Sequence, residues 1–218
     1  MKFELTDETV EHNGIPLFRI KALKSFASVR EGDKGGYVQS LSNLSQEGDS
    51  WIFGEAKVYD RAVISQNAVI ADKAEVYGDA LVSGNAHVRD YAKVSGPLII
   101  TDSVDICSNA YVSGRLYLSG DIIIGKDAEL THEGDFISIS NFSPNNTNIS
   151  AYRDKTGNIL IRKGVSTYSL TDVIPESYAH ARFTHDTIVW NALIDFLLKY
   201  FNREVKHDEE INKKVYEN

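Results

Sequence analysis

The chain has 218 residues, of which 42% are hydrophobic and 25% are charged, a composition typical of globular domains. Its formal net charge is −8, and its lysines and arginines are scattered, so nonspecific binding to nucleic acid or to a membrane is not expected. Cys107 is the only cysteine, so no disulfide can form within the chain. Together with the lack of a signal-peptide pattern in the opening residues, this predicts a cytoplasmic protein.

The first expected element is a β-hairpin. Thr9–His12 and Leu17–Ile20 read as its strands, and Asn13-Gly14 between them is typical of a type I′ turn. We interpret residues 1–50 as an N-terminal hairpin and cap. A cap is needed because unpaired strand edges at the open end of a repeat domain invite aggregation.

Residues 51–130 contain a six-residue repeat. Every sixth residue from Ile52 to Leu130 is aliphatic, and Gly or Asp occupies ten of the thirteen places two residues later. A period of six fits neither a helix nor a single strand. It fits a triangular coil in which an inward aliphatic residue alternates with a corner that Gly or Asp tolerates, and successive coils pair as parallel strands. The sequence therefore predicts a mainly β protein with a parallel β-helix of about four coils.

The repeat from Trp51 to Leu130 resembles that of the hexapeptide-repeat, left-handed β-helix family, which includes many acyltransferases. This resemblance implies the left hand of the coil. The stretch "LFRIKALKSF…GDKGGYV…NLSQEGDSWIFGEA", from Leu17 to Ala56, is similar to the opening of hexapeptide-repeat proteins of phages and prophages. Those relatives have no established activity, so the resemblance implies a phage or prophage setting, with the host cytoplasm as the compartment.

Residues eighteen apart lie one above another in such a coil, and one outer wall is expected to carry an apolar column beside a hydroxyl column. A soluble monomer rarely leaves such a column bare. We expect it to be covered by another subunit of a trimer or dimer, by a partner such as a host protein, or by the chain's own C-terminal segment. The apolar column is Val63, Leu81, Ile99 and Tyr117, and the hydroxyl column is Ser65, Ser83, Thr101 and Ser119.

Residues 131–218 are interpreted as a small α+β domain. Phe136–Ser140 and Ile149–Arg162 predict strands, the second region with a turn at Thr156-Gly157. Residues 169–183 predict a short helix broken by Pro175, and residues 184–205 an amphipathic helix, too short and polar to span a membrane. Between the first strands lies an amide-rich segment that is either a ligand loop or an ordinary turn. Its candidate ligand residues are Asn141, Asn145, Asn146 and Asn148.

Two histidines are candidate catalytic residues. Hexapeptide acyltransferases commonly use a histidine as general base beside a coenzyme A thioester. His87 is the only histidine inside the repeat, and we expect it to form a surface ion pair with Asp105 rather than to act in catalysis, whereas His132 follows the repeat beside Glu133. The chain lacks GxGxxG, P-loop, HExxH and CxxC motifs, so no metal and no cofactor is expected.

These observations favour a non-catalytic accessory binding protein of the phage or prophage type. We expect it to form a homo-oligomer and to antagonise or sequester a component of host defence. Two alternatives stay open: a hexapeptide-type acyltransferase that uses a coenzyme A thioester, and a sponge for a small molecule such as a nucleotide.

Overall fold

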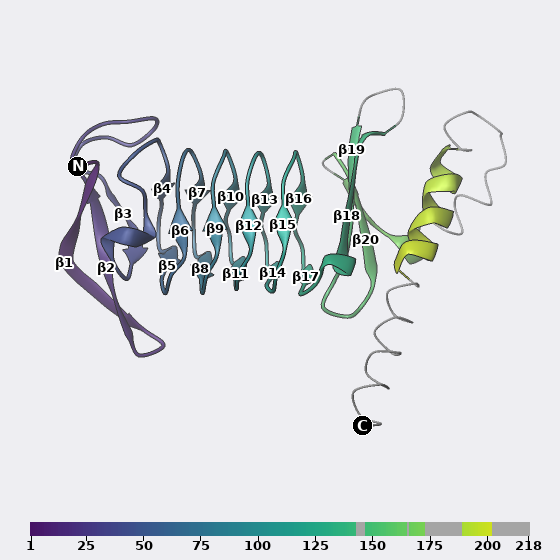
Figure 1. The fold of residues 1–218 in the computed structure, drawn as a ribbon, viewed down its shortest axis with the longest axis horizontal. Helices are drawn as coiled ribbons and strands as arrows, with labels where there is room; N and C mark the ends of the chain where they lie inside the picture. Colours follow the sequence, from purple (N-terminus) through teal and green to yellow (C-terminus); the bar gives the residue numbers. More distant parts are fainter. Residues whose placement is uncertain (143–146, 165, 173–188, 202–218) are drawn as a thin grey trace. The chain divides into compact units, whose positions relative to one another are not determined.

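The computed structural model describes residues 1–142, 147–164, 166–172 and 189–201. The chain divides into two compact units, Met1–Glu133 and Gly134–Asn218. The first unit is a parallel β-solenoid of about five turns that begins with a hairpin, and the second is a small sheet with a helix (Figure 1).

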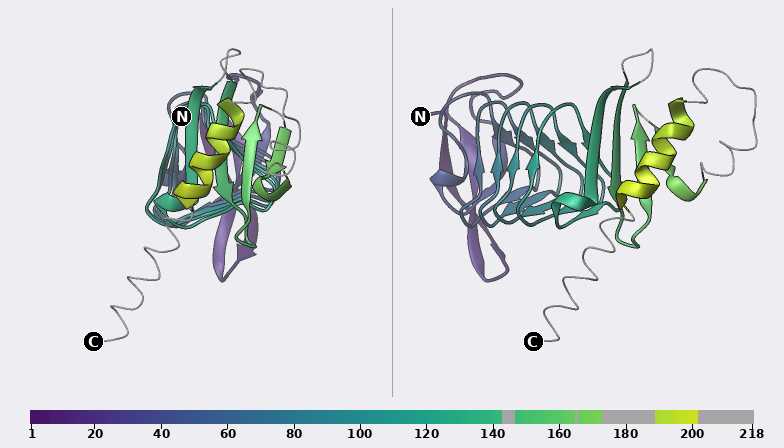
Figure 2. Two further views of the ribbon diagram at one scale, coloured as in Figure 1. Left: turned by 90° about the vertical axis from the view of Figure 1, so that its right-hand side faces the viewer. Right: turned by 45° about the vertical axis from the view of Figure 1, so that its right-hand side comes forward.

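The six-residue repeat forms the strands of the solenoid, which stack in three parallel walls (Figure 2). We name each wall by its first and last solenoid strand: the β6–β15 wall has the order β6-β9-β12-β15, the β5–β17 wall β5-β8-β11-β14-β17, and the β4–β16 wall β4-β7-β10-β13-β16. The strands are β4 (Trp51–Ile52), β5 (Lys57–Val58), β6 (Val63–Ile64), β7 (Val69–Ile70), β8 (Glu75–Tyr77), β9 (Leu81–Val82), β10 (His87–Val88), β11 (Lys93–Ser95), β12 (Ile99–Ile100), β13 (Asp105–Ile106), β14 (Tyr111–Val112), β15 (Tyr117–Leu118), β16 (Ile123–Ile124) and β17 (Glu129–Leu130).

The aliphatic residues of the repeat point into the solenoid. From Ile52 to Leu130, each of them is at most 2% exposed, as the repeat predicts. Residues eighteen apart are paired neighbours, so that Val82 lies between Ile64 and Ile100 on adjacent strands. Burial of these stacked aliphatic side chains supplies the main stabilising free energy of the unit.

The corners explain why Gly and Asp recur. Every sixth residue from Gly54 to Lys126 has a positive φ, between 54° and 96°, which is the region that Gly, Asn and Asp tolerate best. Aspartate adds a second contribution, because its carboxylate accepts a hydrogen bond from the corner N–H of the next coil. Asp60 accepts one from Gly78 at 3.2 Å, and Asp102 accepts one from Gly120 at 3.0 Å.

The N-terminal hairpin is built from β1 (Phe3–His12) and β2 (Ile15–Ala22). Asn13 and Gly14 have φ values of 53° and 76°, as a type I′ turn requires, and His12 pairs with Ile15 across it. The hairpin and its turn are therefore confirmed. The strand β2 pairs antiparallel with β3 (Lys34–Val38), which joins the hairpin to the β5–β17 wall.

The solenoid starts one turn before residue 51. The strand β3 (Lys34–Val38) pairs parallel with β5, and after the short 3-10 helix η1 (Leu41–Asn43), Leu44 bridges to Ile64. Close packing requires glycine in β3: a Cβ on Gly35 would lie 2.6 Å from Ile20 Cγ1. This added turn accounts for about five turns instead of the four coils expected from the repeat. The left hand of the coil stays a prediction.

The second unit is a four-stranded antiparallel sheet in the order β18-β19-β20-β21, packed against a helix over residues 189–201. Leu193, Ile194 and Leu197 of the helix pack on Ile149 and Ile161 of the sheet.

In the described part of the chain, no helix has the length and hydropathy needed to cross a membrane. The predicted break at Pro175 and the predicted start of the long helix lie outside the described residues. The elements are the 3-10 helix η2 (Glu133–Asp135), β18 (Phe136–Phe142), β19 (Thr147–Arg153), β20 (Ile159–Lys163) and β21 (Ser166–Ser169).

Candidate functional site

The β6–β15 wall carries an exposed apolar column. Val63, Leu81, Ile99 and Tyr117 are paired neighbours on successive strands, so their side chains stack along one line. Val63 is half-buried, whereas Leu81 is 36%, Ile99 40% and Tyr117 66% exposed. The column is therefore a projecting apolar ridge.

The hydroxyl column beside this ridge is recessed. Ser83 is buried, and its hydroxyl donates a 3.5 Å hydrogen bond to the carbonyl oxygen of Ile100, while Ser65, Thr101 and Ser119 are half-buried. The eight predicted interface residues thus lie on one wall, as a ridge of large side chains beside a trough of small ones.

Polar residues at the corners border the ridge and the trough. On the ridge side, Arg61 and Asp79 form an ion pair with 2.8 Å between Nη2 and Oδ2. On the trough side, Asn67 donates a 3.0 Å hydrogen bond to Asn85. These four side chains are exposed. The same two corners carry exposed charges in the fourth coil, Arg115 on the ridge side and Asp121 on the trough side.

The first coils of the β5–β17 wall are covered by the hairpin. Leu17, Tyr37 and Tyr59 form a buried cluster, against which Val10, Ile15 and Tyr77 pack. The rings of Tyr59 and Tyr77 are stacked with their centroids 5.0 Å apart. The hairpin thus buries Tyr59 and partly buries Tyr77, whereas Tyr111, on β14 of the same wall and outside this cluster, is 36% exposed.

Glu75 on β8 ties the covered wall to the hairpin. Its carboxylate lies 3.1 Å from His12 Nε2, accepts a hydrogen bond from the Tyr59 hydroxyl at 3.3 Å, and lies 3.4 Å from Lys93 Nζ. Burial raises the pKa of Glu75, but Lys93 and His12 outweigh it and hold the pKa below its usual value. Burial and the neighbouring Glu75 carboxylate raise the pKa of Tyr59. Glu75 is therefore a carboxylate, and Tyr59 a hydroxyl donor, at neutral pH.

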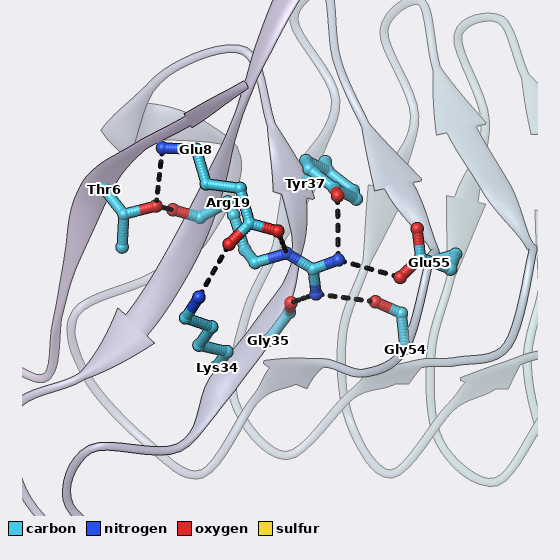
Figure 3. Close-up of polar contacts among 8 residues, drawn as sticks. All are labelled: Thr6, Glu8, Arg19, Lys34, Gly35, Tyr37, Gly54 and Glu55. Carbon is cyan, nitrogen blue, oxygen red and sulfur yellow. Dashed lines mark hydrogen bonds and ion pairs between the residues drawn. The ribbon is translucent and has the colours of Figure 1, made fainter. Parts of the chain in front are cut away.

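Arg19 is the centre of a second cluster at the base of the hairpin (Figure 3). Its guanidinium donates hydrogen bonds to the Gly35 carbonyl at 2.8 Å, to the Tyr37 hydroxyl at 2.7 Å and to Glu55 at 2.8 Å. Its Nε also lies 2.7 Å from Glu8, an ion pair whose N–H is not aimed well enough for a hydrogen bond. Burial lowers the pKa of Arg19, but Glu55 and Tyr37 raise it overall, so the cation clamps the hairpin to the first turns.

Lys2 is a buried cation at the start of the chain. Its side chain is 1% exposed, and its ammonium donates to the Ser50 carbonyl oxygen at 2.9 Å and the Gly48 carbonyl oxygen at 3.3 Å. Burial lowers the pKa of Lys2 to about 8. Lys2 fastens β1 to the loop before β4, so its role is structural.

The candidate catalytic residues are placed differently from the expectation. His87 is exposed on β10, and Asp105 is its paired neighbour on β13. Arg89, rather than His87, forms the ion pair with Asp105 in the described part of the chain: Nε lies 3.0 Å from Oδ1 and Nη2 lies 2.8 Å from Oδ2. The planar fork of arginine engages both carboxylate oxygens, which an imidazole cannot do. Cys107, beside them, is buried.

The other candidate residues are not gathered into one site. His132 is exposed between β17 and η2. Asn141 has a φ of 55°, and its N–H donates a 3.2 Å hydrogen bond to the Asn148 side chain, whereas Asn145 and Asn146 lie outside the described residues. Among the described residues, no group of three or more His, Cys, Asp or Glu side chains could hold a metal ion.

No protein-family model and no curated protein sequence matches the chain. The parallel β-solenoid of about five turns is compatible with the resemblance to a β-helix repeat family. Sequence reasoning located the ridge and the trough through the eighteen-residue period, but it missed the clusters of Glu75 and Arg19. Those clusters join residues up to 63 positions apart, as His12 and Glu75 are, and no local pattern marks them.

Proposed function

We propose that this chain is a non-catalytic binding protein that engages another protein through the β6–β15 wall. The observation that carries the proposal is the ridge, in which three successive large apolar side chains are 36–66% exposed. Contiguous exposed apolar surface with a polar rim is typical of a protein interface. The rim here consists of the corner residues Arg61, Asp79, Asn67 and Asn85.

The wall is also suited to binding because its backbone is held in place. Each strand of the wall is paired with the strands of adjacent coils, for example Leu81 with Val63 and Ile99. A surface ordered before association loses little conformational entropy on binding. The affinity of such a surface then depends on its shape and polarity.

We further propose that the protein belongs to the phage or prophage accessory type and antagonises or sequesters a host defence component. This part is supported only by the resemblance of the segment from Leu17 to Ala56, which is an analogy of sequence and not of chemistry. On this proposal the protein acts in the host cytoplasm, with a host protein as a candidate partner.

The binding proposal is tested by photo-crosslinking from the two exposed tyrosines. A benzophenone side chain replaces Tyr117 on the ridge in one variant and Tyr91, 58% exposed outside this wall, in the control. We expect covalent protein adducts from position 117 and not from position 91, since only the ridge lies in an interface. Equal adduct yields from the two positions, or none from position 117, would overturn the proposal.

The same preparation tests the two alternatives. An acyltransferase would be stabilised by acetyl-coenzyme A, and its turnover would be lost in His87→Ala or His132→Ala. A nucleotide sponge would release a bound nucleotide in mass spectrometry of the purified protein. Asp105 is engaged by Arg89, so it does not orient His87 as the carboxylate of a catalytic pair would. This argues against the acyltransferase. The binding proposal predicts neither result, and either one would contradict it.

A further inference from the structure

We propose that the partner of the β6–β15 wall is a second copy of this chain, related by a two-fold axis parallel to the solenoid axis. This inference rests on the binding proposal above and names its partner. In this arrangement the two walls face each other with equal coils at equal height. Four features of the wall support it: the ridge, the trough, the charges at the corners, and the positions of these charges along the solenoid axis.

The ridge and the trough make the wall complementary to itself. The ridge residues precede the inward residue of each strand and the trough residues follow it, so the two columns run side by side. A two-fold axis parallel to the columns places the ridge of each copy over the trough of the other. Leu81 then lies against the recessed Ser83 of the second copy, and Ile99 against Thr101. Such an isologous contact buries both ridges at once.

The perpendicular two-fold axis in the same plane gives a poorer contact. It would reverse one solenoid and set ridge against ridge, with the two troughs facing each other as a gap. It would also bring Arg61 of one copy to Arg115 of the other, because both lie on the ridge-side corner at opposite ends of the wall. The repulsion between these two like charges disfavours that arrangement.

The corner charges fit the parallel arrangement. It brings the ridge-side corner of each copy to the trough-side corner of the other at the same height. Arg115 then faces Asp121 of the second copy, and the symmetry repeats this pair on the other side. The remaining pairs at equal height join a charge or proline to an uncharged polar residue, for example Asp79 with Asn85. The two-fold axis maps each coil onto the same height, so the register follows from the symmetry and keeps Arg115 at the height of Asp121.

The contact is small, because four strands at a spacing of about 4.8 Å give a wall about 15 Å long between its outer strands. We expect its area to lie at the lower end of the range for specific interfaces. We therefore expect a dimer that dissociates in the micromolar range, about 1–100 µM. In such a weak dimer, the attraction between opposite charges at the rim contributes measurably to the free energy of association.

A charge exchange tests the arrangement. Sedimentation velocity on the full chain measures the dimer dissociation constant for wild type, Arg115→Asp, Asp121→Arg and the double variant. Each single change sets two like-charge pairs at the interface and should weaken the dimer about tenfold, while the double variant restores two attractive pairs and should return to within about threefold of wild type. Lys73→Asp reverses an exposed charge outside this wall and should leave the dimer unchanged.

The outcomes separate this inference from the binding proposal. If both single variants weaken the dimer and the double variant does not recover, or if neither single variant changes it, the parallel arrangement is wrong. A wild type that stays monomeric to about 200 µM, well above the expected dissociation constant, excludes the second copy as partner. Adducts of position 117 with a different protein would in that case still support the binding proposal. Rescue by the double variant excludes misfolding as the cause of the single effects.

Discussion

Two outward tyrosines of the same solenoid lie in opposite environments. On the β5–β17 wall, Tyr59 is 4% exposed because the hairpin covers it, whereas Tyr117 on the β6–β15 wall is 66% exposed. Both walls have the same short strands, the same corners and the same inward core. The difference between Tyr59 and Tyr117 therefore comes from the hairpin, which covers the first coils of the β5–β17 wall. Beyond the hairpin, Tyr111 of the same wall is 36% exposed.

The largest expected effect separates the two tyrosines. Tyr59→Ala removes a buried ring that stacks on Tyr77 and a hydroxyl that binds Glu75, so we expect a loss of about 3 kcal/mol in the free energy of unfolding. Tyr117→Ala removes an exposed ring and should change it by less than about 0.5 kcal/mol. Urea denaturation at protein concentrations below the onset of association measures both values. Similar losses for the two variants would show that the hairpin does not set the walls apart.

The corners common to both walls are expected to be the next most sensitive positions. Gly84 has a φ of 67°, and a Cβ there would lie 2.5 Å from the backbone nitrogen of Asp102. Gly84→Ala should therefore cost about 2 kcal/mol. Gly120 also has a positive φ but no heavy atom within 4 Å of the same Cβ, so Gly120→Ala should cost only about 1 kcal/mol. Thermal unfolding of the pair measures the difference, and equal costs would contradict the close stacking of the coils.

A smaller effect is expected at Glu75, under the cover. Glu75→Gln weakens the contacts to His12 and Lys93 and should cost about 1 kcal/mol at pH 7. Because folding lowers the pKa of Glu75, its stabilisation is complete above the usual carboxyl pKa and is lost as the pH falls through the folded value. The stability of wild type should thus fall more steeply on acidification than that of the variant. Parallel pH profiles, or additivity with His12→Ala, would contradict the coupling.

The solenoid could be predicted because its determinants are local and repeated. An inward aliphatic residue and a left-handed corner each recur every six residues, and the thirteen corners from Gly54 to Lys126 all have positive φ. The first turn was missed although Val38 and Leu44 keep the six-residue spacing. The next position of that series is Ser50, which is not aliphatic, and the aliphatic repeat resumes two residues later at Ile52. Residues of the added turn therefore pair with residues twenty positions later in the sequence, instead of eighteen.

The candidate site could be predicted only where it follows from the period. The ridge and the trough lie on one wall because their members are eighteen residues apart. The same rule correctly placed His87 beside Asp105, but it gave no information on the reach of side chains, and Arg89 takes the carboxylate instead. The cover of the β5–β17 wall depends on how the hairpin folds over the strands, which the repeat does not encode.

The most direct test of the exposed wall as a contact surface is the molar mass of the intact chain by light scattering as its concentration rises. Wild type should exceed the monomer mass of 24.3 kDa with increasing concentration, and His87→Glu, an exposed change on the β4–β16 wall, should behave like wild type. Leu81→Glu places a charge in the middle of the ridge and should stay at the monomer mass. A wild type that is monomeric at every concentration, or a Leu81→Glu variant that associates like wild type, would contradict self-association through this wall.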